Sequence, residues 1–294
     1  MNAGGISAPL ASTEWLAERL GDPGLVVVDA HVERVALPSG GFVRRPARAA
    51  FEQDGHIAGA RFADLLNDFS DPGAPFPFTR PSSRQMEIAA GALGLTSENT
   101  VVVYDRANGV WAARLWWLLR AFGHDNASVL DGGFRKWTQE RRPISLGDVP
   151  AAVSGASFRA RKRETFFVDK EEVVAVMERR APGRLVCVLR PSVFAGAEKP
   201  YARAGHIPGS LNIPYVDLID ETTNLFRPPA RLRVSFAPAL SGGERVILYC
   251  GGGVTAAGSA LALTLLGVPD VAVFDGSLNE WAADPALPLH APAV

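Results

Sequence analysis

Cysteine and histidine are scarce in this chain of 294 residues. It holds two cysteines, Cys187 and Cys250, and neither belongs to a CxxC pair. A disulfide framework is therefore not expected. The five histidines are scattered along the chain and form no metal-ligand spacing. We expect a protein that works without a bound metal or cofactor.

The chain also has no large excess of positive or negative charge and no long apolar run. The formal net charge is −1, which argues against a nucleic-acid or membrane-surface partner. No apolar run reaches the roughly 18 residues that a membrane span needs. The opening residues, MNAGGISAPLASTEW, lack the basic and apolar regions of a secretory signal. The expected setting is a reducing cytoplasm.

The sequence repeats itself at the scale of a domain. Three segments recur in the same order: GHIAGA at 55–60 and GHIPGS at 205–210, VVVY at 101–104 and VILY at 246–249, and DGGFRKW at 131–137 and DGSLNEW at 275–281. The chain length also suits two domains. We predict a first domain over 1–145, a linker over 146–163 that is poor in large apolar residues and carries Gly147, Pro150 and Gly155, and a second domain over 164–294.

Each half alternates short apolar strands with helices. The predicted strands are 25–28, 101–104 and 127–130 in the first half, and 185–189, 246–249 and 271–274 in the second. The predicted helices are 112–120 and 256–266. Continuous apolar strands between helices indicate an α/β fold whose mainly parallel sheets have helices on both faces. Ligands of such sheets bind at the carboxyl ends of strands, where Cys250 lies.

Cys250 opens the loop Cys250-Gly251-Gly252-Gly253-Val254-Thr255 between a strand and a helix. Glycines allow positive φ, so that successive N–H groups can point at one centre. The helix beginning near Val254 or Thr255 directs its positive end there as well. A thiol in this place should ionise readily and act as a nucleophile. The alternative is a buried cysteine beside a flexible turn, and Cys187, inside a strand, is predicted to be a core residue.

These repeated motifs and the YCGGGVTA segment resemble tandem rhodanese domains over nearly the whole chain. The resemblance implies that the second domain is catalytic and the first is silent, because Asp105 stands in the position of Cys250. It also implies sulfur transfer: Cys250 takes a sulfur atom from a small donor and passes the persulfide sulfur to an acceptor. The amides of Gly251, Gly252, Gly253, Val254 and Thr255 would hold the substrate. The acceptor would be cyanide or a thiol, such as thioredoxin or a low-molecular-weight thiol.

The loop sequence separates two types within this family. CGGGVT is similar to the CGSGVT loop of 3-mercaptopyruvate sulfurtransferases rather than to the CRKGVT loop of thiosulfate sulfurtransferases, so the first donor is favoured and thiosulfate is next. Gly252 stands where the first type has a hydroxyl. The resemblance implies that Asp64 helps to move protons; a helix cap or a solvated carboxylate is the alternative for Asp64. The active site is expected where the two domains meet.

Several positions depart from the family pattern. Val188 replaces an aspartate, and Val193 falls where a substrate-binding arginine is expected. Arg203 is the candidate for a second substrate-binding arginine, and a solvated surface arginine is its alternative reading. Glu198 matches a glutamate with a bracing role. These departures motivate a second hypothesis, a persulfide carrier or partner-binding module with little turnover. Phosphatase or arsenate-reductase chemistry would need an arginine where this chain has Ala256.

The remaining notable residues are predicted to be structural. His56 and His206 recur in both halves, which favours a hydrogen bond within the turn. Trp116 and Trp117 are expected in the core. The pair Arg44-Arg45 and the run 159–163 are expected in solvated loops.

Overall fold

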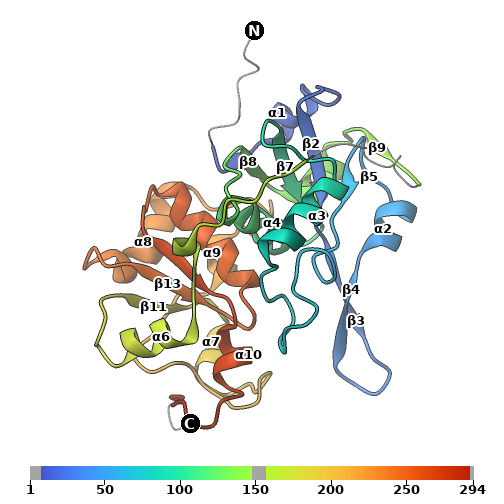
Figure 1. Ribbon diagram of the computed structural model, residues 1–294. Coiled ribbons are helices and arrows are strands. Elements are labelled where there is room, and N and C mark those ends of the chain that lie inside the picture. Colours follow the sequence, from blue (N-terminus) through green and yellow to red (C-terminus); the bar gives the residue numbers. More distant parts are fainter. Residues whose placement is uncertain (1–7, 148–156, 292–294) are drawn as a thin grey trace. The chain divides into compact units, whose positions relative to one another are not determined.

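The computed structural model describes residues 8–147 and 157–291 (Figure 1). The chain divides into two compact units, one ending at Lys162 and the other beginning at Arg163. Residues 148–156 of the predicted linker lie outside the described residues.

The first unit is built on a five-stranded parallel sheet in the order β1-β8-β7-β2-β6. Two antiparallel pairs, β3–β4 and β5–β9, accompany it. Its elements are β1 (Leu10–Ala11), α1 (Thr13–Ala17), β2 (Leu25–Asp29), β3 (Val32–Ala36), β4 (Phe42–Pro46), α2 (Arg48–Gln53), β5 (His56–Ile57), β6 (Arg61–Phe62), α3 (Ser83–Ala92), β7 (Thr100–Tyr104), α4 (Val110–Ala121), β8 (Ala127–Leu130), α5 (Gly133–Gln139) and β9 (Ile144–Ser145).

The second unit has its own five-stranded parallel sheet in the order β10-β14-β13-β11-β12. Its elements are the 3-10 helix η1 (Glu164–Phe166), β10 (Phe167–Val168), α6 (Lys170–Met177), β11 (Arg184–Cys187), α7 (Pro191–Phe194), β12 (Leu211–Asn212), the 3-10 helix η2 (Tyr215–Leu218), α8 (Pro229–Leu240), β13 (Val246–Tyr249), α9 (Val254–Leu265), β14 (Val271–Phe274) and α10 (Ser277–Trp281).

The two sheets share one topology, so the duplication read from the sequence is also a duplication of structure. Strand β7 pairs with β2 and β8 as β13 pairs with β11 and β14. The predicted strands at 127–130, 246–249 and 271–274 have the observed bounds, and the helix expected to begin near Val254 begins there. Strand β11 ends at Cys187, two residues before the predicted end.

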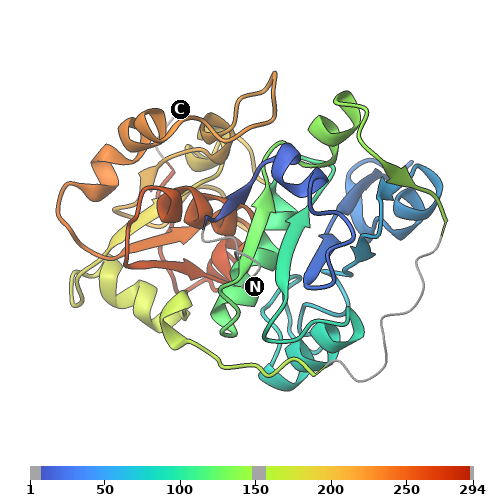
Figure 2. The same ribbon diagram turned by 90° about the horizontal axis from the view of Figure 1, so that it is seen from above.

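The central strands of each sheet are buried on both faces, which is why most of their residues are apolar. In the second unit one face packs against α6 and α10, while α9 lies along β13 and β14 on the other (Figure 2). Cys187 has no exposed surface, and burial raises the pKa of its thiol to about 12. It is an inert core residue, as predicted, and Trp116 and Trp117 are buried too.

The structural role predicted for the two repeated histidines is confirmed. Nδ1 of His56 lies 3.0 Å from the carbonyl oxygen of Phe51, and Nδ1 of His206 lies 2.7 Å from that of Phe194. The loop expected at Arg44 and Arg45 was wrong: both lie in β4, because that segment pairs with β3 in an exposed hairpin. No helix within the described residues is long and apolar enough to cross a membrane.

Candidate active site

Cys250 lies directly after the carboxyl end of β13 and four residues before α9 begins at Val254. Its side chain is buried, with 2% of the residue exposed. Gly253 is the N-cap of α9 and has a φ of +73°, a left-handed conformation that favours glycine. Gly251 and Gly252 do not adopt positive φ, so conformational freedom accounts for Gly253 but not for them.

Ser277, the first residue of α10, holds the cysteine loop in place through hydrogen bonds to its backbone. Its buried hydroxyl oxygen accepts hydrogen bonds from the backbone N–H groups of Cys250 (3.1 Å) and Gly253 (3.2 Å). The same hydroxyl donates to the carbonyl oxygen of Phe274 at 2.7 Å. One side chain therefore fixes both ends of the Cys250–Gly253 turn. It also occupies the N–H of Gly253, so that amide is not available to the substrate in the way the sequence suggested.

Four other amides of the loop are open. Among residues 8–147 and 157–291, no acceptor serves the backbone N–H groups of Gly251, Gly252, Val254 and Thr255. Those of Val254 and Thr255 belong to the first turn of a helix, whose N–H groups have no intrahelical partner. They carry the positive end of the α9 dipole. A negatively charged sulfur on Cys250, or an anionic group bound beside it, is therefore stabilised here.

The first unit shows what such a loop binds. Asp105 follows β7 as Cys250 follows β13, and Gly109 caps α4 with a φ of +86° as Gly253 caps α9. The buried carboxylate of Asp105 accepts hydrogen bonds from four backbone N–H groups, those of Ala107 (2.8 Å), Gly109 (3.1 Å), Trp111 (2.9 Å) and Ala112 (3.0 Å). The amide cradle of this half is thus filled by a carboxylate of the chain itself.

The two halves of the chain differ in what occupies this loop. The carboxylate of Asp105 takes up the hydrogen bonds of the loop amides and offers no nucleophilic thiol, which agrees with a silent first domain. In the second unit a thiol takes that position and the amides stay open. The sequence pointed to the substitution of Asp105 for Cys250 but not to the internal hydrogen bonds. An acidic residue placed between a strand and a helix N-terminus was the signal for them.

Tyr201 is a site residue that the sequence analysis missed. A Cβ atom added to Gly251 would meet the phenol of Tyr201, with ring carbons Cε1 and Cζ at 2.9 Å and the hydroxyl oxygen closer still. Gly251 is therefore glycine because of this neighbour. Tyr201 is half-buried and packs against the core of the second unit. Nothing in its own sequence neighbourhood marks it, since the contact joins residues 50 positions apart.

The guanidinium of Arg203 is committed to the protein backbone. It donates to four carbonyl oxygens of the C-terminal segment, those of Trp281 (3.1 Å), Ala282 (3.0 Å), Asp284 (2.6 Å) and Leu287 (2.8 Å). Four of its five N–H groups are used, so this geometry corrects both sequence interpretations, the substrate-binding arginine and the solvated one. Val188 and Val193 are buried, with 2% and 4% exposed.

Asp64 lies in the first unit and organises a turn. Its carboxylate accepts from the backbone N–H groups of Leu66 (2.9 Å) and Asn67 (3.0 Å), and from Nδ2 of Asn67 (2.7 Å). This is the capping arrangement named as its alternative role. Glu198 accepts from Arg190 at 2.7 Å and from Ser192 at 2.6 Å. That glutamate braces the chain after β11, as its resemblance implied.

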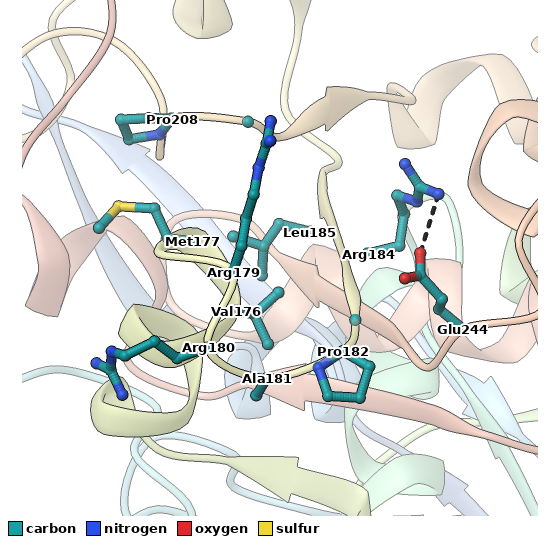
Figure 3. A pocket seen from close by; sticks show the side chains of 12 residues that line it. Val176, Met177, Arg179, Arg180, Ala181, Pro182, Arg184, Leu185, Pro208 and Glu244 are labelled. Atoms are coloured by element: carbon teal, nitrogen blue, oxygen red, sulfur yellow. Dashed lines mark ion pairs between the residues drawn. The ribbon is translucent and has the colours of Figure 1, made fainter.

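A separate cavity of about 540 Å³ lies in the second unit (Figure 3). Its lining includes Arg184 and Leu185 at the start of β11, Arg180 after α6, and Glu244 before β13. Arg184 pairs with Glu244 at 2.9 Å, and Arg180 pairs with Glu178 at 2.6 Å. The cavity is at the amino ends of the strands, opposite the edge that carries Cys250, and it is not part of the cysteine site.

Fold and site together define a duplicated α/β protein in which a buried cysteine lies on a loop with open backbone N–H groups at the start of a helix. A sequence profile of the rhodanese-like domain matches residues 12–140 and 189–284. The chain belongs to the rhodanese family.

Relatives of known activity span nearly the whole chain and are sulfurtransferases. Rattus norvegicus 3-mercaptopyruvate sulfurtransferase is 36% identical over 287 residues, covering 92% of this chain and 91% of the relative. Cricetulus griseus thiosulfate sulfurtransferase is 34% identical with the same coverage. The crystal structure of Escherichia coli SseA, described by its rhodanese fold and 3-mercaptopyruvate sulfotransferase mechanism, matches with a TM-score of 0.77 and 31% identity over 92% of this chain and 98% of that one.

Proposed function

We propose that this protein is a sulfurtransferase that forms a persulfide on Cys250, with 3-mercaptopyruvate as the favoured donor and thiosulfate next. The observation that carries the proposal is the pair of cradles: one is filled by the Asp105 carboxylate, and the other is open around Cys250. The same loop architecture thus binds an anion in one half and presents a nucleophile in the other.

The donor half-reaction follows from this geometry. The thiolate of Cys250 attacks the sulfur of 3-mercaptopyruvate, a sulfur–sulfur bond forms, and the carbon–sulfur bond breaks. The electron pair of that bond passes to carbon, and protonation of the resulting enolate gives pyruvate. The open amides of Gly251, Gly252, Val254 and Thr255 stabilise the negative charge of the persulfide sulfur. With thiosulfate the leaving group would be sulfite.

The acceptor half-reaction returns the cysteine. A thiolate attacks the outer sulfur of the persulfide, and the electron pair of the sulfur–sulfur bond goes back to Cys250. Thioredoxin and low-molecular-weight thiols are the proposed acceptors. Both cysteines of the chain are free, which supports action in the reducing cytoplasm.

The preference for 3-mercaptopyruvate is supported by the uncharged loop. Gly251 and Gly252 put no cation beside the nucleophile, so a donor with one negative charge suits the site better than a dianion. The names of the relatives do not separate the two donors, because both occur at similar identity. On the family resemblance, Asp64 is proposed to help move protons between Cys250 and the thiol of the substrate.

The test is the intact mass of the protein under non-reducing conditions after brief exposure to each donor. A gain of one sulfur atom in the wild type, absent in Cys250→Ser, is the expected result, with the faster gain from 3-mercaptopyruvate. Loading without turnover when thiol is added would favour the persulfide-carrier alternative, which the buried Val193 and the committed Arg203 support. No gain from either donor would overturn the proposal.

A further inference from the structure

The second unit contains a segment that is longer than its counterpart in the first. In both units a histidine ring stacks on a phenylalanine ring, with centroids 3.9 Å apart for Phe51 and His56 and 3.5 Å apart for Phe194 and His206. The two residues are 5 positions apart in the first unit and 12 in the second. The chain between Phe194 and His206 is therefore seven residues longer than that between Phe51 and His56. We call residues 195–204, the stretch that contains the extra residues, the inserted segment.

The inserted segment is anchored at both ends. Near its start, Glu198 accepts from Arg190 and Ser192. Near its end, the guanidinium of Arg203 donates to four carbonyl oxygens of residues 281–287. Tyr201 lies between these anchors, and its ring packs against the core of the unit. Such support on both sides holds a side chain in one position, as a binding site requires.

The phenol of Tyr201 reaches the residue that follows the nucleophile. Its hydroxyl and two of its ring carbons surround the place where a side chain on residue 251 would begin. Tyr201, Gly251 and Gly252 are half-buried, whereas the Cys250 residue is 2% exposed. Tyr201 and the two residues after the nucleophile are therefore more accessible than Cys250 itself.

We propose that Tyr201 determines donor specificity. Its hydroxyl donates a hydrogen bond to the carboxylate of a small thiol-bearing monocarboxylate, and its ring fills the space that a side chain on residue 251 would occupy. Val193 has no charge to offer that carboxylate, and four of the five N–H groups of Arg203 are bound to the backbone. One neutral hydroxyl and the open amides recognise a single negative charge without a cation. This inference rests on the proposed sulfur transfer from 3-mercaptopyruvate.

The first experiment compares Tyr201→Phe with Tyr215→Phe. Tyr215 is the matched control because its ring also packs against a glycine of the same unit, Gly258. The measurement is the rate of persulfide formation on Cys250 in single-turnover mass spectrometry at increasing 3-mercaptopyruvate. A hydrogen bond to a charged group is expected to be worth roughly 10- to 100-fold in half-saturating concentration. Tyr201→Phe should show that increase with a similar maximal rate, and Tyr215→Phe should not.

The second experiment approaches the same contact from the loop. Gly251→Ala places a methyl group where the Tyr201 phenol lies, so the phenol must move, and half-saturation should rise as it does in Tyr201→Phe. In a Tyr201→Ala background the added methyl should have little further effect, which makes the two changes non-additive.

Two results would overturn the inference. One is an unchanged half-saturating concentration in Tyr201→Phe while the wild type forms its persulfide normally. The other is full additivity of Tyr201→Ala and Gly251→Ala. A wild type that forms no persulfide with either donor would instead contradict the proposed function, so the two failures are distinguishable.

Discussion

Removing the hydroxyl of Ser277 should loosen the cysteine loop and destabilise the second unit. In Ser277→Ala the N–H groups of Cys250 and Gly253 lose their acceptor and the carbonyl of Phe274 loses a donor. Because Ser277 is fully buried, three lost hydrogen bonds at about 1 kcal/mol each lower the free energy of unfolding by roughly 3 kcal/mol. A displaced nucleophile should also slow persulfide formation by about 10- to 100-fold.

Two further serine variants separate the causes. Ser277 has a φ of +49°, so Ser277→Gly loses the same hydrogen bonds but relieves about 1 kcal/mol of backbone strain. It should be more stable than Ser277→Ala and equally slow. Ser259 is also fully buried, but its hydroxyl has no hydrogen-bond partner among the described residues. Ser259→Ala should leave stability unchanged or raise it by about 1 kcal/mol.

The assays are denaturant unfolding, followed by a signal from the second unit, and the rate of sulfur gain on Cys250 by mass spectrometry. If Ser277→Ala proves as stable as Ser259→Ala and loads sulfur at the wild-type rate, the hydroxyl does not hold the loop and the reasoning fails.

Three other substitutions test the remaining assignments. Burial raises the pKa of Asp29 to about 6, although the guanidinium of Arg106 opposes the shift. Between about pH 4 and 6 the folded state therefore binds more protons than the unfolded state. The stability of the folded state then falls by up to roughly 3 kcal/mol as the pH rises through this range. Asp29→Asn should flatten this slope in unfolding measured against pH, and an unchanged slope would contradict the assignment. Arg203→Gln removes the clamp on residues 281–287, so the thermal midpoint should fall by several degrees. Because Arg203 is also one of the two anchors of the segment that holds Tyr201, half-saturation by 3-mercaptopyruvate should rise, but less than it does in Tyr201→Phe. A larger rise with an unchanged thermal midpoint would restore a substrate-binding role for Arg203. Asp64→Asn keeps a side-chain oxygen for the turn but cannot transfer a proton, so it should lower the turnover of 3-mercaptopyruvate about 10-fold or more with little change in melting temperature, and full turnover would leave Asp64 with a structural role alone.

The features that could be predicted from the sequence are local. Strands 246–249 and 271–274 are short apolar runs, and the loop after the first of them combines a cysteine, three glycines and a helix start in consecutive residues. The repeat then fixes the domain plan, because a second copy of each motif doubles the signal. Even the inert role of Cys187 follows from its apolar neighbours.

The features that could not be predicted depend on contacts between distant residues. Ser277 lies 27 residues from Cys250, and no sequence pattern indicates that its hydroxyl contacts the cysteine loop. Gly251 looks like a conformational glycine until Tyr201 is seen against it. Arg203 shows the same limit, because an arginine before a turn gives no sign that four backbone carbonyls surround it.

The carboxylate of Asp105 makes the first unit a receptor that carries its own ligand. Since that ligand is covalently attached, its effective concentration never changes, and small anions in solution have nothing to add to the stability of this half. The open cradle of the second unit follows the opposite rule: an anion that occupies it stabilises the folded state by RT ln(1 + [L]/Kd). The two copies of the duplicated domain therefore differ in one thermodynamic property: anions in solution leave the stability of the first unit unchanged, whereas an anion bound in the second unit raises its stability.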